Sequence, residues 1–172
     1  QWAKTQDIYR QAESLMHIGI ITEALGHYAR AQKHYSEALQ LAKSVKYVYL
    51  ESHIHVNLAN LALNQRKWQD AEKHSRAALE IAEGMKDQRA KSIAYENLAL
   101  AQIGRRDFAR AAQSIQKAKQ IAASIGDGER LIDMELVDFE RRIAMKPEKD
   151  LPAELEIMRQ TAVSKGYLAA LP

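Results

Sequence analysis

The six histidines are the residues in this sequence best suited to metal chemistry, and their spacing does not form a ligand set. His53 and His55 are two positions apart, which places them on nearly opposite sides of a helix. His27, His34 and His74 have no second histidine or carboxylate one helical turn further on. The chain also lacks Cys, which excludes thiolate ligands, disulfides and a cysteine nucleophile. We therefore expect no metal site, no cofactor, and surface or turn roles for these histidines.

Acidic residues are plentiful, but their spacing is that of solvated helix faces rather than of a catalytic pair. Asp133, Glu135 and Asp138 are examples. The sequence contains no phosphate-binding loop, no nucleophile elbow and no dinucleotide fingerprint. We therefore expect a protein that is not an enzyme.

The composition predicts an all-α protein. The 172 residues include only seven Gly and three Pro, whereas Ala, Leu, Gln, Glu, Lys and Arg, which favour helices, dominate. The net charge of +3 is spread along the chain, unlike the concentrated basic surface of most nucleic-acid binders. No apolar run is as long as a membrane span, and no signal peptide is evident. We expect a cytoplasmic protein without a membrane partner.

The elements that must position any functional side chain come from an internal repeat of 40 residues. Segments 25–42, 65–82 and 105–122 align, and their shared columns hold an aromatic residue and two alanines: Tyr28, Trp68 and Phe108; Ala31, Ala71 and Ala111; Ala38, Ala78 and Ala118. In the second unit, apolar spacing predicts helices over about 47–64 and 68–83. The short connection between them makes the two helices antiparallel neighbours.

The repeated columns have a physical interpretation. Alanine allows two helices to approach closely, and the aromatic residue is expected to fill the open end of each pair. The segments 83–87 and 124–128 each contain a Gly followed by an Asp, which predicts the end of one helix and the start of the next. One helix pair cannot bury its apolar face alone, so successive pairs should stack on a shared core.

These columns resemble the tetratricopeptide repeat. The matching residues are Leu15, Ile18, Gly19, Thr22, Ala31, Tyr35 and Ala38; His55, Leu58, Ala59, Ala62, Ala71, Ser75 and Ala78; and Tyr95, Leu98, Ala99, Gln102, Ala111, Ile115 and Ala118. The period exceeds the usual 34 residues, and Lys43, Glu83 and Ala123 replace the closing Pro. The chain is thus similar to the long-repeat branch found in kinesin light chains, Leu-Gly-Asn-type adaptors and bacterial regulators. The resemblance implies a right-handed α-solenoid of antiparallel helix pairs.

The repeat divides the chain into one array. We expect repeats over 7–44, 47–84 and 87–124, and a degenerate capping repeat over 129–166. The second helix of the cap carries an apolar stripe: Leu151, Leu155, Met158 and Ala162. The opening residues 1–5 resemble residues 40–44, where a helix ends. We therefore expect 1–5 to be the end of a preceding helix, and the chain to be a fragment of a longer protein.

In this family the first helix of each pair lines a concave binding face. Carried over column by column, the resemblance implies peptide contacts at Met16, Ile20, Glu23, His53, Val56, Asn60, Leu63, Asn64, Ile93, Glu96, Leu100 and Ile103. Asn57 and Asn97 are expected to join neighbouring helices instead. Three helices about 10 Å apart would hold an extended peptide of about eight residues. The apolar, partly acidic lining favours a protein or peptide segment with apolar anchors and some basic character.

Two other functions remain open at this point. The long period suggests, by analogy, a regulatory domain of a bacterial signalling or transcription protein that senses a ligand or partner. RNA binding by helical repeats is the third alternative, although acidic residues on the expected binding face argue against it. The sequence leaves homodimerisation open.

Overall fold

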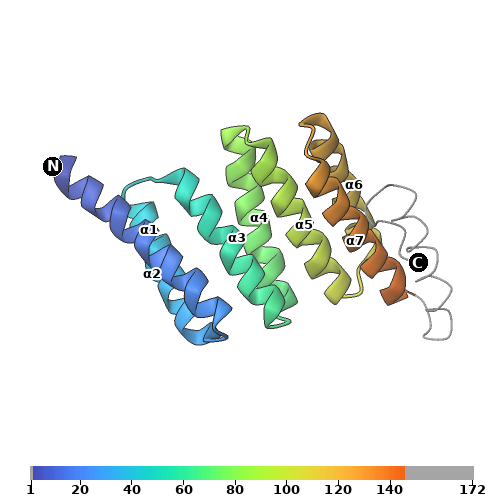
Figure 1. Cartoon of the computed structure of the whole chain (residues 1–172), viewed down its shortest axis with the longest axis horizontal. Coiled ribbons are helices and arrows are strands. Elements are labelled where there is room, and N and C mark those ends of the chain that lie inside the picture. The colour runs from blue at the N-terminus through green and yellow to red at the C-terminus, as the bar shows by residue number, and fades with distance from the viewer. Residues whose placement is uncertain (1, 146–172) are drawn as a thin grey trace, which may run out of the picture.

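The computed structural model describes residues 2–145, which form seven α-helices and contain no strand. The all-α prediction is confirmed for this part of the chain. The helices are α1 (Trp2–Ala24), α2 (Tyr28–Ser44), α3 (Val48–Asn64), α4 (Trp68–Met85), α5 (Gln88–Gly104), α6 (Phe108–Ser124) and α7 (Gly128–Met145) (Figure 1). None of these helices is both long and apolar enough to cross a membrane. The expected helix with the apolar stripe after residue 150 lies outside the described residues.

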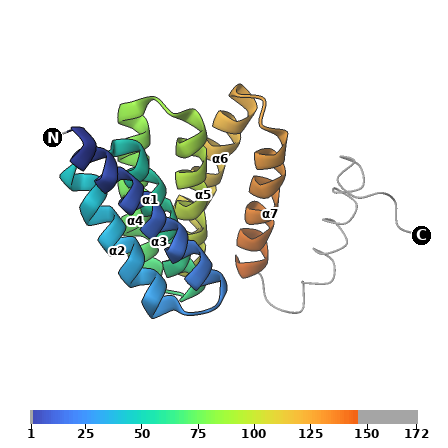
Figure 2. The ribbon, with the colours of Figure 1, turned by 60° about the vertical axis from the view of Figure 1, so that its left-hand side comes forward.

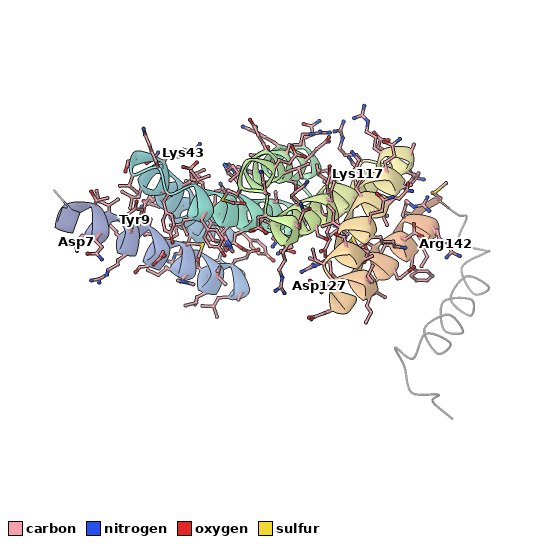
Figure 3. All side chains as sticks on the ribbon, turned by 90° about the horizontal axis from the view of Figure 1, so that it is seen from above. Asp7, Tyr9, Lys43, Lys117, Asp127 and Arg142 are labelled. Atoms are coloured by element: carbon pink, nitrogen blue, oxygen red, sulfur yellow. The ribbon has the colours of Figure 1, made fainter. Side chains whose placement is uncertain are left out.

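Consecutive helices pack pairwise. The pairs α1–α2, α3–α4 and α5–α6 are each in contact, and each second helix also contacts the first helix of the next pair. The first helices, α1, α3, α5 and α7, also touch one another in sequence, and they follow one another across Figure 2. In Figure 3, Tyr9 of α1 and Asp127 of α7 lie on one side of the molecule, whereas Lys43 of α2 and Lys117 of α6 lie on the other. The helices thus form two layers, one of first helices and one of second helices.

Six turns of the same backbone geometry join these helices, at intervals of 20 residues. The residue with positive φ in each turn is, in order, Gly26, Lys46, Arg66, Lys86, Arg106 and Gly126. In every turn the next residue donates its N–H to the carbonyl five residues earlier, as from Tyr47 to Ala42 at 2.8 Å. This is the Schellman arrangement, which satisfies the last carbonyls of a helix. The predicted helix end at Gly126 is confirmed. The predicted end at Gly84 is wrong, because α4 continues to Met85 and Lys86 takes the left-handed conformation.

The starts of the helices differ between the two halves of the described chain. Asp87, Asp107 and Asp127 each accept a hydrogen bond from the backbone N–H three residues later. These are side-chain N-caps, which satisfy one of the free donors of the first turn. His27 and Tyr47, at the equivalent positions of earlier turns, make no such bond. The predicted helix starts at Asp87 and Asp127 are confirmed.

At its N-terminal end, α1 differs from the sequence prediction. The expected break between Thr5 and Asp7 is absent, and the helix runs without interruption from Trp2 to Ala24. This segment holds no Pro, and its only Gly is Gly19. No residue there forces the chain out of helical geometry, so the backbone hydrogen bonds continue through the expected boundary.

The alanine columns form the core, as expected. Ala31, Ala71 and Ala111 are fully buried, and Ala38, Ala78 and Ala118 are almost so. The first unit accommodates a larger side chain, Tyr35, at the position of Ser75 and Ile115. It does so because Gly19 lies opposite: a Cβ added there would lie 2.5 Å from Cε1 of Tyr35. The missing side chain of Gly19 thus makes room for a buried aromatic ring.

Candidate functional site

The largest feature on the layer of first helices is a cavity of about 730 Å³. We call it the groove cavity. It is lined by residues of α1, α3 and α5 together with two tyrosines of α2: Ile20, Glu23, Ala24, Tyr28, Tyr35, Asn57, Asn60, Leu63, Asn64, Glu96, Asn97 and Leu100. Seven of the twelve residues predicted for the binding face are among them: Ile20, Glu23, Asn60, Leu63, Asn64, Glu96 and Leu100. The helical spacing therefore brings much of the predicted site together.

The other five predicted residues do not line the groove cavity. Met16 is only 8 % exposed and belongs to the core between α1 and α2, so its predicted role as a surface contact is wrong. Ile103 packs against the core of α5, α6 and α7. His53 is exposed and lies against Tyr49, with ring centroids 4.5 Å apart. Val56 and Ile93 are half-buried.

Glu23 is held at one end of the groove cavity by two neutral donors. Its Oε2 accepts a hydrogen bond from the hydroxyl of Tyr35 at 2.8 Å. Its Oε1 accepts one from Nδ2 of Asn64 at 2.9 Å. Burial, and then the hydrogen bond to Glu23, raise the pKa of Tyr35, so the tyrosine remains a protonated donor. The carboxylate thus joins α1, α2 and α3.

Glu96 lies on α5 and is paired with a cation. Nη1 of Arg130, on α7, donates to Oε2 of Glu96, and it also lies 3.4 Å from Oδ2 of Asp133. Burial raises the pKa of Glu96, and the guanidinium of Arg130 acts in the opposite direction. The sequence analysis missed Arg130, because this contact joins residues 34 positions apart.

Amide side chains occupy the middle of the groove cavity. Nδ2 of Asn97 donates to Oδ1 of Asn60 at 2.9 Å, which joins α5 to α3. The predicted role of Asn97 in joining neighbouring helices is therefore confirmed. Asn57 lines the groove cavity next to this pair and is half-buried. An amide has two donors and two acceptor sites, so these residues retain capacity for a ligand backbone.

Tyr28 and Tyr35 were not predicted to line this site. Tyr28 was expected to close the end of its helix pair, yet it is 39 % exposed and lines the groove cavity. In the next pair, the ring of Trp68 lies directly over Gly104, in the space that a Cβ would take. The residue equivalent to Gly104 in α3 is Asn64, which has a side chain and bonds to Glu23. This substitution leaves no equivalent place for the Tyr28 ring.

His55 and His74 form a pair between α3 and α4, away from the groove cavity. Their Nδ1 atoms are 3.1 Å apart, a hydrogen bond in which one ring donates and the other accepts. Burial lowers the pKa of His55 to about 4, with His74, Lys43 and Lys73 adding to the effect. The surface or turn role expected for these histidines is wrong for His55, which is buried. Within residues 2–145, no group of three or more His, Asp or Glu side chains is placed to hold a metal ion.

No family model matches this chain, and no curated protein matches it. The interpretation of its function therefore rests on the residues and geometry described above.

Proposed function

We propose that the chain is a tetratricopeptide-like, right-handed α-solenoid that binds a peptide or an extended segment of a protein in the groove cavity, without catalysing a reaction. The observation that carries the proposal is the lining of the groove cavity by three successive first helices, which offers apolar side chains, free amide groups and a carboxylate along one surface. An extended chain presents the complementary groups, namely apolar side chains and backbone N–H and C=O.

Two features support the solenoid. The turns repeat their positive-φ residue every 20 positions, so each helix and turn has the same length. Every first helix also contacts the next first helix, as stacked pairs of a repeat protein do. The family columns quoted from the sequence fall on these contacts, with the Ala columns at the centre of the packing.

A binding role accounts for the polar groups better than an acid–base reaction does. The two carboxylates of the groove cavity lie on α1 and α5, and each is already engaged by donors of its own chain. The amides of Asn60 and Asn97 are bonded to each other, which fixes their orientation before a ligand arrives. Such fixed polar groups between apolar side chains are typical of recognition surfaces.

Panning a phage-displayed library of random peptides, each about nine residues long, tests the proposal. Wild-type protein should enrich related peptides, and the double variant Ile20→Arg/Leu100→Arg should enrich none of them. Ile125→Arg is the matched control, because Ile125 is exposed to the same extent as Ile20 but lies in the turn after α6. Circular dichroism should show equal helicity for all three proteins. Unchanged enrichment by the double variant would show that the groove cavity is not the binding site.

A further inference from the structure

The two carboxylates of the groove cavity differ in whether a cation of the chain neutralises them. Glu96 is paired with Arg130, which also contacts Asp133. Glu23 accepts hydrogen bonds from Tyr35 and Asn64, both of them neutral, and no cation of the described residues forms an ion pair with it. The notebook of contacts on this surface is therefore asymmetric: one end carries a matched charge and the other an unmatched one.

We propose that Glu23 is the binding site for a lysine or arginine side chain of the bound segment. This inference rests on the proposed function and specifies which end of the groove cavity takes the basic residue. The bound segment would place its apolar side chains against Leu63 and Leu100, and its cation at the α1 end.

The geometry around Glu23 is suited to this role. A carboxylate has about four acceptor positions, and the bonds from Tyr35 and Asn64 use two of them. The remaining positions can accept charge-assisted hydrogen bonds, which are about twice as strong as neutral ones. The two internal donors also hold the carboxylate in place, so little side-chain entropy is lost when a cation binds.

The neighbours of Glu23 fit the rest of a long basic side chain. Ile20 and Tyr28 line the groove cavity on the same helix and on the next one, and both are partly exposed. The methylene stem of a lysine or arginine packs well on such surfaces while its head reaches a carboxylate. The ring of Tyr28 also offers an aromatic face, which attracts cations.

Glu96 is unsuited to the same role. A ligand cation would have to compete with Arg130, which belongs to the same chain and is therefore present at a high effective concentration. Arg130 is itself held by Asp133. The difference between the two carboxylates gives a matched pair of variants, Glu23→Gln and Glu96→Gln, that change charge by the same amount.

The peptide library described above tests the inference with these two variants. We expect peptides enriched by wild-type protein and by Glu96→Gln to share a Lys or Arg at one position. Peptides enriched by Glu23→Gln should show no such preference. Replacing that Lys by norleucine in a synthetic peptide should weaken binding to wild-type protein on the order of tenfold, and should leave binding to Glu23→Gln unchanged.

Two results would overturn the inference while leaving the proposed function intact: enriched peptides without a basic residue, or a basic preference that survives in Glu23→Gln. Absence of any enrichment by wild-type protein would instead refute the proposed function, and the inference with it. Should Glu23→Gln lose helicity, the norleucine substitution still decides the question on wild-type protein, because an unchanged affinity there contradicts a cation site.

Discussion

The junction between α2 and α3 and the junction between α4 and α5 lie at equivalent places in successive helix pairs, yet they are packed in different ways. At α4–α5, the ring of Trp68 covers Gly104. Next to it, Glu72 of α4 is buried and receives hydrogen bonds from Arg76 and Arg105. At α2–α3, Tyr28 remains partly exposed, and Asn64 replaces the glycine.

This difference explains where the groove cavity forms. A single side chain at the last turn of a first helix decides whether the aromatic residue of the preceding helix is covered or left facing the cavity. At Gly104 the aromatic ring closes the junction, and at Asn64 the side chain turns to Glu23 instead. The tight junction therefore contributes mainly to stability, and the open junction supplies a polar surface for recognition.

The largest effect is expected from truncating the core of the open junction. Leu61 of α3 is fully buried, so Leu61→Ala should lower the free energy of unfolding by about 2–5 kcal/mol, measured by urea denaturation. Ile21 occupies the equivalent position on α1 and is 59 % exposed. Ile21→Ala should change stability by less than about 0.5 kcal/mol. Equal losses in the two variants would contradict the assignment of these faces.

Adding one methyl group should open the tight junction. In Gly104→Ala the new Cβ would overlap the ring of Trp68, which must move or strain the backbone. Overpacking of this kind costs about 1–3 kcal/mol. The fluorescence of Trp68, measured with Trp2→Phe in the background, should shift to longer wavelength as the ring becomes hydrated. Gly84→Ala is the control, because no atom lies within 4 Å of a Cβ there.

A smaller, pH-dependent effect is expected from the histidine pair between the junctions. The folded-state pKa of His55 is about 4, below the ordinary value of 6.5, and the pKa of His74 is also lowered. The unfolded chain therefore binds more protons between these two values, and stability should decrease as the pH falls from about 6.5 to about 4. The nearby charged groups are Lys43, Lys73 and Asp70, and only Asp70 favours protonation, acting on His74.

The variant His55→Leu tests this dependence. Leucine already stands at the equivalent position of the first unit, Leu15, so the substitution has a precedent in the same fold. Urea denaturation should show a weaker decrease in stability from pH 6.5 to pH 4 in the variant than in wild-type protein. An unchanged pH profile would show that the pair does not titrate as described.

The smallest effect should be the same at both junctions. The turns after α2 and α4 place Lys46 and Lys86 at positive φ, a conformation that costs non-glycine residues about 1–2 kcal/mol. Because glycine also loses more entropy on folding, Lys46→Gly and Lys86→Gly should each stabilise by about 0.5–1 kcal/mol, measured by thermal unfolding. Unequal gains would indicate that the turns, and not only the side chains, distinguish the two junctions.

Much of the fold could be predicted from the sequence because it depends on local interactions. The Ala columns, the helix start at Asp87 and the turn at Gly126 follow from residue types at fixed offsets. Gly84 was misleading, since a glycine near a helix end is common but not required there. Lys86 could take the left-handed conformation because the next residue completes the same hydrogen bonds.

The candidate site was predicted only in part, because a column states the position of a residue but not what covers it. Ile20 and Leu100 were placed correctly, whereas Met16 occupies a similar column and is buried in the core. The contact from Arg130 to Glu96 and the pair of His55 with His74 join different helices, so no spacing within one helix indicates them.

The sequence by itself determined the helices, their 40-residue period and the small residues at their contacts, because hydrogen bonding within a helix and close helix packing depend on residue type and spacing. Only the tertiary structure decided which aromatic residue is covered, which carboxylate has a cation and which histidines meet. Those outcomes depend on side chains brought together from separate helices, as Tyr35 and Asn64 are at Glu23. The identity of a residue is fixed along the chain, but its exposure and charge balance are set by its neighbours in space.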